Sequence, residues 1–170
     1  MIHSFVFSPS GTTAKIADAI TRCLGMETTS HNLTVKASGN IDISSDADIA
    51  VFAMPVYAGR IPALAADRLQ AVSGKGQNAV VTVVYGNRDY DDALIELADI
   101  ATARGFNVVA AGAFIAQHCI FPKVATGRPD SGDAQKLAEF ARIAAQAAAD
   151  GHRLDLDKIK GKRPYKKAAG

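Results

Sequence analysis

The chain has 170 residues, enough for one domain with a substantial hydrophobic core, and its 48% hydrophobic and 21% charged residues are ordinary for a globular protein in water. No apolar run approaches the roughly 20 residues that cross a bilayer, and no basic segment followed by an apolar one marks a secretion signal, so we expect a cytoplasmic protein without a membrane span. The net charge of +2 hides an asymmetry, because residues 158–167 hold six lysines and arginines and the rest of the chain has a net charge of −4.

In chain order, the first element is an apolar stretch at residues 2–7, which predicts a buried strand. A helical apolar stripe covers residues 14–24, and a weaker run at residues 27–36 predicts an edge strand. Cys23 and Cys119 lie in apolar segments without CxxC spacing, so we expect two buried, reduced thiols and no metal site. The loop between the first strand and the first helix has the sequence Ser8-Pro9-Ser10-Gly11-Thr12-Thr13.

Three later runs are rich in Val, Ile and Phe with little polar alternation, which is typical of strands in a parallel sheet covered on both faces; they are residues 48–54, 79–85 and 107–116. Helical patterns separate and follow them. One begins at Pro62 and continues through Val72, and the next runs from about Asp89 to a stop at Gly105. The last opens near Ser131 and ends at residues 150–151, and Arg128 is expected to fix the turn before it.

Strands that alternate with helices imply right-handed βαβ units and therefore an α/β domain of three layers. Five strands in about 150 residues match the flavodoxin-like fold, a five-stranded parallel sheet with strand order 2-1-3-4-5. We expect this domain at residues 1–150 and a basic tail or linker at residues 151–170. The tail is too short, and with Tyr165 alone too poor in aromatic residues, for a nucleic-acid binder, so we expect a solvated terminus or the start of a linker.

The loop after the first strand has the chemistry of an anion site, because its backbone N–H groups and the helix N-terminus supply partial positive charge and its hydroxyls supply donors. No Gly-Lys-Ser/Thr follows, which excludes a Walker A motif, and Gly11 stands alone where a dinucleotide fingerprint needs three glycines. A phosphate loop built from hydroxyls favours a mononucleotide, with flavin mononucleotide (FMN) as the first candidate. The candidate phosphate-binding residues are Ser8, Pro9, Ser10, Gly11, Thr12 and Thr13.

In the expected strand order, the ligand also meets the loops after the third and fourth strands. Both loops offer tyrosine and glycine, which suit a flat isoalloxazine ring because it needs aromatic or apolar walls and close backbone amides. Two arginines in these loops favour the reduced, anionic flavin if they face the ring and have no such role if they face solvent. The candidate ring-binding residues are Pro55, Val56, Tyr57, Ala58, Gly59, Arg60, Tyr85, Gly86, Asn87, Arg88 and Tyr90, with His118, at the end of the last strand, either near the flavin or structural.

These loops resemble those of the flavodoxin superfamily. Flavodoxins carry a T/S-x-T-G-x-T phosphate loop, which residues 8–13 fit with serine at two hydroxyl positions. Residues 86–90 resemble the loop whose aromatic residue, here Tyr90, stacks on the flavin, and residues 57–59 are similar to the loop with a second aromatic residue. The phrases at residues 7–13, 55–57, 85–88 and 127–130 resemble, more narrowly, the flavodoxin-type N-terminal domain of bacterial flavodoxin–ferredoxin fusion proteins.

The resemblance implies an FMN-binding electron-transfer protein that works with redox partner proteins such as a ferredoxin or a reductase. The cysteine motifs of the ferredoxin part are absent from the sequence, so no iron–sulfur function is carried over. Two alternatives remain: an FMN-dependent NAD(P)H or quinone reductase on the same fold, and a flavodoxin-like module that no longer binds flavin. A phosphoacceptor receiver domain is excluded, because Ser8 and Pro55 stand where that domain needs acidic residues. The sequence leaves the oligomeric state open.

Overall fold

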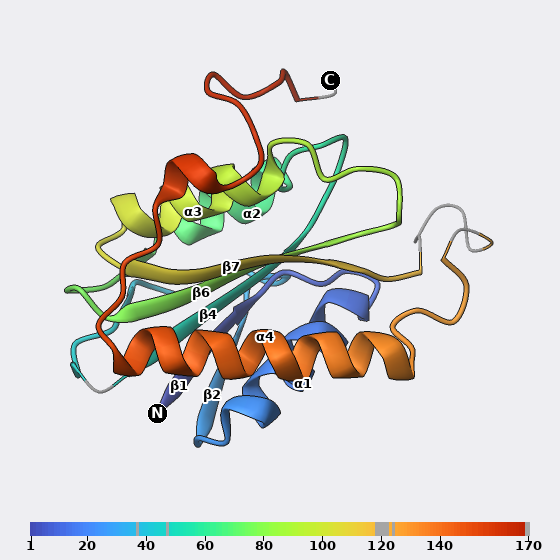
Figure 1. The fold of residues 1–170 in the computed structure, drawn as a ribbon. Coiled ribbons are helices and arrows are strands. Elements are labelled where there is room, and N and C mark those ends of the chain that lie inside the picture. The colour runs from blue at the N-terminus through green and yellow to red at the C-terminus, as the bar shows by residue number, and fades with distance from the viewer. Residues whose placement is uncertain (37, 47, 118–122, 124, 169–170) are drawn as a thin grey trace.

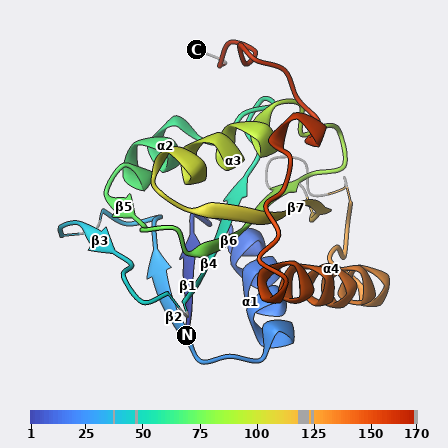
Figure 2. The same cartoon turned by 60° about the vertical axis from the view of Figure 1, so that its left-hand side comes forward.

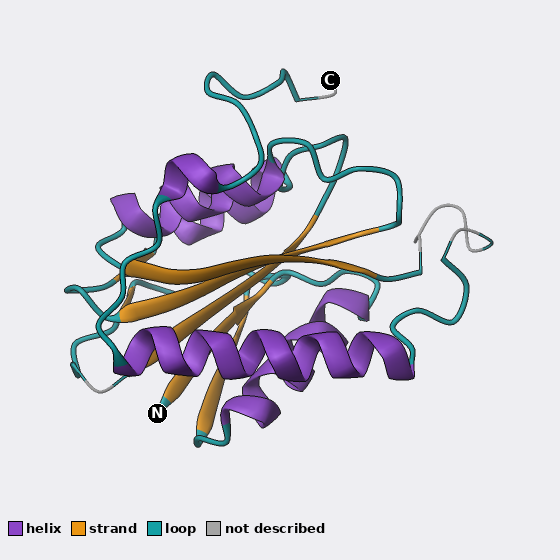
Figure 3. Cartoon of the chain, viewed as in Figure 1, coloured by secondary structure: helices purple, strands orange, loops and turns teal. Residues whose placement is uncertain are grey.

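The computed structural model describes residues 1–36, 38–46, 48–117, 123 and 125–168. Within these ranges the predicted strands and helices follow one another in the predicted order, and the structure adds two short strands and a short 3-10 helix that were not predicted (Figures 1 and 3). None of the described helices is both long enough and apolar enough to cross a membrane. The elements are β1 (Ile2–Val6), α1 (Thr12–Leu24), β2 (Thr28–Asn32), β3 (Ile41–Asp42), β4 (Ile49–Pro55), α2 (Ala63–Leu69), β5 (Val72–Ser73), β6 (Asn78–Tyr85), α3 (Ala93–Ala103), β7 (Asn107–Ile115), α4 (Ser131–Ala149) and the short 3-10 helix η1 (Leu156–Lys158).

Five parallel strands form the central sheet in the order β2-β1-β4-β6-β7. Counted among these strands alone, the order is 2-1-3-4-5, so the predicted flavodoxin-like arrangement is confirmed. The register places Phe5 of β1 opposite Phe52 of β4, and their rings stack with centroids 5.0 Å apart. Strands β4 and β6 are buried along nearly their whole length, which explains why their sequences lack polar alternation.

Helices cover both faces of the sheet, α1 and α4 on one face and α2 and α3 on the other (Figures 1 and 2). The apolar cluster on the α1–α4 side includes Ile16, Ile20 and Leu137, and the cluster on the opposite side includes Leu69 and Leu97. Because all five strands are parallel, their carboxyl ends meet at one edge of the sheet. The loops after β1, β4 and β6 are therefore brought together there.

Three element boundaries differ from the prediction. The weak run at residues 27–36 narrows to β2, whose side chains are mostly exposed, as an edge strand allows. Val72, predicted inside the second helix, lies instead in β5, because α2 ends at Leu69 and the chain then pairs with β3 in a separate two-stranded sheet. The third helix begins at Ala93 with Asp92 as its N-cap, because Asp91 has a left-handed φ of 41° that a right-handed helix does not allow.

The prediction that Cys23 is buried is wrong, because Cys23 is exposed in the last turn of α1. The buried side chains of α1 include Thr13, Ala17 and Thr21, four residues apart, so the buried stripe drifts away from Cys23 along the helix. Cys119 lies outside the described residues.

The described part of the tail, residues 151–168, lies against the domain, which differs from the solvated terminus that its charge led us to expect. The N–H of Leu154 donates to the carbonyl of Val108 over 2.9 Å, and Leu154, Leu156 and Ile159 pack against the apolar cluster on the α2–α3 side. The tail docks because these three apolar side chains alternate with its charged ones. The division of the chain into a domain and a tail at residue 150 stays a prediction.

Candidate functional site

Ser8 fixes the path of the first loop. Its N–H donates to Oγ1 of Thr34 over 2.8 Å, which ties the loop to the segment after β2. Its own Oγ accepts the N–H of Ala14, in the first turn of α1, over 3.0 Å. The Ser8 hydroxyl therefore accepts one of the free N–H groups at the start of α1, and this hydrogen bond helps to hold the loop in place.

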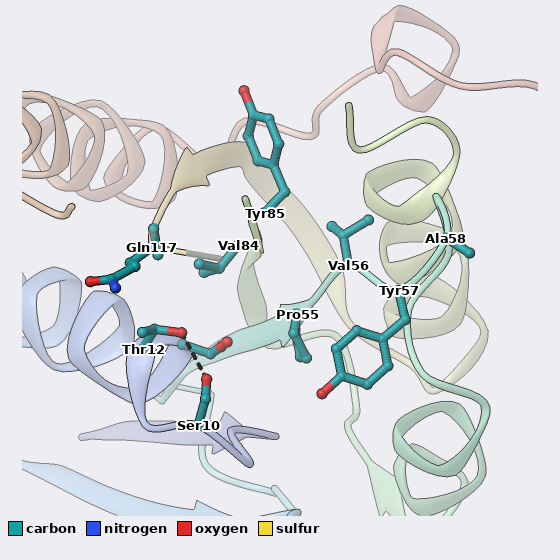
Figure 4. Close-up of a pocket in the computed structure, with 11 residues that line it drawn as sticks. Ser10, Thr12, Pro55, Val56, Tyr57, Ala58, Val84, Tyr85 and Gln117 are labelled. Carbon is teal, nitrogen blue, oxygen red and sulfur yellow. Dashed lines mark hydrogen bonds between the residues drawn. The ribbon is translucent and has the colours of Figure 1, made fainter. Parts of the chain in front are cut away.

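Ser10 of this loop is exposed and Thr12 is half-buried, whereas Thr13 is buried. Gly11 is the N-cap of α1 and has a left-handed φ of 85°, a conformation that glycine adopts without strain. The hydroxyls of Ser10 and Thr12 lie 3.1 Å apart and hydrogen-bond to each other (Figure 4). The loop thus presents two adjacent hydroxyls directly at the N-terminus of α1, where the helix dipole favours an anion.

A pocket of about 190 Å³ opens beside these hydroxyls, at the carboxyl edge of the sheet (Figure 4). Hydroxyls lie on one side of it, and Pro55, Val56 and Val84 provide apolar surface (Figure 4). The segments that line it come from the ends of β4, β6 and β7 as well as from the first loop. The lining residues are Ser10, Thr12, Thr13, Pro55, Val56, Tyr57, Ala58, Val84, Tyr85, Ala116 and Gln117.

Eight of the residues proposed from the sequence line this pocket, namely Ser10, Thr12, Thr13, Pro55, Val56, Tyr57, Ala58 and Tyr85. Sequence reasoning missed Val84, Ala116 and Gln117. Their signal was present in the topology, because each lies at or just past the carboxyl end of β6 or β7, where ligands of open α/β sheets bind. His118 lies outside the described residues.

The two tyrosines of the pocket point in different directions (Figure 4). Tyr57 is 43% exposed, and its ring extends from the loop after β4 beside Pro55. Tyr85 points away from Ser10 and Thr12, and its ring meets the edge of Tyr90 at a centroid distance of 5.3 Å. Burial raises the pKa of the Tyr85 hydroxyl above its usual value, so it stays protonated at neutral pH.

The loop after β4 is a tight turn in which Tyr57 and Arg60 exchange two backbone hydrogen bonds, of 2.8 and 3.1 Å. Ala58 and Gly59 at its tip have left-handed φ values of 50° and 81°. Gly59 has no room for a side chain, because a Cβ there would lie 2.3 Å from a carboxylate oxygen of Asp91. The glycine is needed for this close approach of the two loops.

Arg60 does not belong to the pocket lining, and it does not point freely into solvent either. Its Nε and Nη2 donate to the two carboxylate oxygens of Glu96, each over 2.7 Å, and its Nη1 donates to the carbonyl of Lys166 over 2.7 Å. The guanidinium also lies 4.9 Å from the centroid of the Tyr165 ring. Hydrogen bonding to Glu96 raises the pKa of Arg60 still further, so its charge is permanent and directed toward α3.

The loop after β6 departs most from its expected role. Within the part of the chain that the structure describes, Gly86, Asn87, Arg88 and Tyr90 are not pocket-lining residues, and the same holds for Ser8, Pro9, Gly11 and Gly59. Tyr90 packs against the apolar cluster on the α2–α3 side, with the Nζ of Lys160 4.6 Å from its ring centroid. In this conformation the ring of Tyr90 belongs to the protein's packing.

The side of the pocket formed by Gln117 is held in place by the turn before α4. The N–H of Gln117 donates to the carbonyl of Arg128 over 3.1 Å, and the guanidinium of Arg128 pairs with both carboxylate oxygens of Asp133. Asp133 also forms a capping box with Asp130 at the helix start. Arg128 thus fixes the turn before α4, as its position in the sequence predicted.

No protein-family model matches the chain, and no curated protein matches its sequence. Solved structures do match. An oxidoreductase from Corynebacterium diphtheriae superposes with a TM-score of 0.61 at 13% identity, over 88% of this chain and 96% of its own. Oxidised flavodoxin 1 from Bacillus cereus has a TM-score of 0.58 at 17% identity, over 85% of this chain and 97% of its own.

A flavodiiron core from Synechocystis gives a TM-score of 0.60 at 18% identity, over 89% of this chain and 36% of its own. The chain therefore spans about a third of the length of that protein. At identities this low the superpositions establish architecture alone. The chain has the flavodoxin-like fold, which it shares with flavodoxins and with part of the flavodiiron cores.

Proposed function

We propose that this chain is an FMN-binding electron-transfer protein of the flavodoxin type, which passes electrons between redox partner proteins. The observation that carries the proposal is the convergence of the hydroxyls of Ser10 and Thr12 with Tyr57 on one pocket at the carboxyl edge of the sheet. An anion site and an aromatic wall on the same pocket suit a ligand with a phosphate at one end and a flat ring at the other.

The residues fit this ligand as follows. Ser10, Thr12 and Thr13 would donate hydrogen bonds to the phosphate, and the N-terminus of α1 would favour its charge. Pro55 and Val56 offer apolar contact, and the exposed ring of Tyr57 offers a face that excludes water from one side of a flat group. FMN, when bound, supplies the electron-transfer chemistry, and the protein adjusts the potential through the charges it places nearby.

Titration with flavins tests the proposal. We expect the intact chain to take up FMN, measured as quenching of flavin fluorescence, and to bind riboflavin, which lacks the phosphate, more weakly. The double variant Ser10→Ala/Thr12→Ala should lose at least tenfold in affinity for FMN, because a hydrogen bond to a charged group contributes about 1.5–3 kcal/mol, and should bind riboflavin as before. The exposed Ser30→Ala on β2 is the matched control.

Absence of FMN uptake by the intact chain would refute the proposal and support the alternative of a flavodoxin-like module that no longer binds flavin. Steady-state oxidation of NAD(P)H with a quinone by the loaded protein would instead support the reductase on the same fold. Retention of full FMN affinity in the Ser10→Ala/Thr12→Ala variant would show that the phosphate binds elsewhere.

A further inference from the structure

The basic tail does not end at the apolar contacts of Leu154 and Leu156. Residues 160–166, which we call the strap, continue beyond η1 along α3 toward its N-terminal end (Figures 1 and 2). This end of α3 is the point where the loops after β4 and β6 meet, since the N–H of Asp92 donates to the carbonyl of Gly59 over 3.0 Å. The strap therefore lies against the loop after β4, which the proposed function assigns to the flavin, and against the loop after β6 beside it.

Asp92 is the main anchor of the strap. Its side chain is at the N-cap of α3, and the residue is only 7% exposed. One carboxylate oxygen accepts the N–H of Lys162 over 2.9 Å, and the other accepts the N–H of Lys166 over 2.7 Å. A buried carboxylate needs such donors, and here the strap's main chain supplies one to each oxygen.

Lys166 joins the two loops directly. Its carbonyl accepts a hydrogen bond from Arg60 of the β4–α2 loop over 2.7 Å, and its Nζ pairs with Asp91 of the β6–α3 loop at 2.9 Å. Its side chain also packs over Gly59, since a Cβ at Gly59 would lie 2.7 Å from Cδ of Lys166. One residue of the strap thus holds both loops at a fixed separation.

Further contacts attach the strap to the outer side of α3 and to the second loop. Arg163 donates to both carboxylate oxygens of Asp99 over 2.8 and 2.7 Å, and the hydroxyl of Tyr165 donates to the same carboxylate. Lys160 pairs with Asp89 at 2.6 Å. Five of the seven residues of the strap are therefore bound to a carboxylate of the domain.

The loops themselves need such support. Three of the non-glycine residues with left-handed φ lie in them: Ala58 at 50°, Asn87 at 63° and Asp91 at 41°. Backbone in this region is costly for residues with a side chain and persists where surrounding contacts fix it. The strap supplies contacts of that kind to Asp91 and to the residues beside Ala58.

We infer that the strap positions the flavin site: through Asp92 and Lys166, both positioning residues, it holds residues 86–92 against residues 57–61 and so keeps Tyr57 and Ala58 in the arrangement that receives the isoalloxazine ring. The inference rests on the proposed function for its ligand and on the contacts above for its mechanism. Because the strap contacts the loop that carries Tyr57 and none of its contacts above involves the first loop, its loss should weaken the binding of the ring and leave the binding of the phosphate unchanged.

The test compares the full chain with a chain that ends at Ile159, which keeps the apolar contacts of the tail and removes the strap. FMN and riboflavin should both bind at least tenfold more weakly to the shortened chain, by the same factor. The control is the full-length double variant Lys158→Ala/Lys167→Ala, which removes two exposed tail charges outside the strap and should bind both flavins as the unaltered chain does.

Equal affinities of the full and shortened chains would overturn the inference, and so would a loss confined to FMN, since that loss would place the strap's effect at the phosphate loop. If the shortened chain does not fold, Asp92→Asn in the full chain takes its place, because an amide offers only one acceptor to two N–H groups. Hydrogen exchange gives a readout without flavin: amides of residues 57–61 and 86–92 should exchange at least tenfold faster once the strap is released. If the full chain binds neither flavin, the proposed function fails. The claim that the strap holds the two loops would then be tested by hydrogen exchange alone, and unchanged exchange rates would overturn it.

Discussion

Replacing Arg60 by alanine should destabilise the fold through the carboxylate that it leaves behind. The side chain of Glu96 is 6% exposed and accepts three hydrogen bonds, two from Arg60 at 2.7 Å and one from the N–H of Ile61 at 3.1 Å. Without Arg60, a buried negative charge keeps a single donor. The decrease in the free energy of unfolding therefore includes the cost of an uncompensated buried charge as well as the lost ion pair.

The size of this effect follows from burial. Removing one partner of a fully buried ion pair costs about 3–5 kcal/mol. The side chain of Arg60 is 21% exposed, so water reaches the site once the guanidinium is gone. We expect a loss of about 2–3 kcal/mol in the free energy of unfolding for Arg60→Ala. Glu96→Ala should cost less, about 1–2 kcal/mol, because the freed guanidinium can turn toward solvent.

Urea denaturation of the two single variants and of Arg60→Ala/Glu96→Ala closes a double-mutant cycle. The double variant buries no unpaired charge, so its loss should fall short of the sum of the single losses by about 1–2 kcal/mol. The control cycle uses Glu139 and Arg142 of α4, which pair over 2.9 and 2.7 Å but are 57% and 65% exposed. That exposed pair should couple by about 0.5 kcal/mol or less. Additive losses at Arg60 and Glu96, within about 0.5 kcal/mol, would refute the reasoning.

Three further predictions concern the rest of the site. Gly11→Ala should lower the free energy of unfolding by about 1 kcal/mol, measured in urea, because alanine is strained at a φ of 85° although no atom lies within 4 Å of the added Cβ. Arg128 lowers the pKa of Asp133 from 3.8 to about 2, so this carboxylate stabilises the fold above about pH 4 and loses that contribution as the pH falls toward 2. The advantage of the unaltered chain over Asp133→Asn, about 1–2 kcal/mol at pH 7, should therefore shrink along that pH range, and an advantage that stays constant would contradict the pairing. Arg88→Ala, at an exposed position, should lower the potential of bound FMN by no more than about 20 mV, as measured against redox dyes, and a rise in potential would exclude a stabilising role for this arginine.

The fold was predictable because burial leaves a strong mark on the strands. Strands β4 and β6 are covered on both faces, so their residues are apolar nearly throughout, and several such runs separated by helices are typical of a parallel sheet between two layers of helices. The short strands β3 and β5 leave no such mark, since two residues each carry no periodicity. An element this short shows no hydrophobic pattern in the sequence, and it forms only because it pairs with another strand.

The site was predictable in its chain segments and less so in its side-chain directions. The first loop and Tyr57 face the pocket because topology alone brings strand ends together. Tyr90 packs against the apolar cluster and Arg60 turns toward Glu96, 36 residues further along the chain. Neither orientation has a local cause, because each depends on which partner the folded chain brings close.

The docking of the tail shows where charge counting fails. Six cations in ten residues indicate a solvated segment only if the rest of the chain offers them no partners. The loop before α3 carries Asp89, Asp91 and Asp92, and Asp99 lies in the middle of the helix; these four carboxylates repel one another unless cations or N–H groups lie among them. The excess of cations in the tail and the excess of carboxylates at α3 neutralise each other when the tail docks. The negative net charge of residues 1–157 was therefore the signal for docking, and it predicts that high salt should loosen the strap before it unfolds the domain.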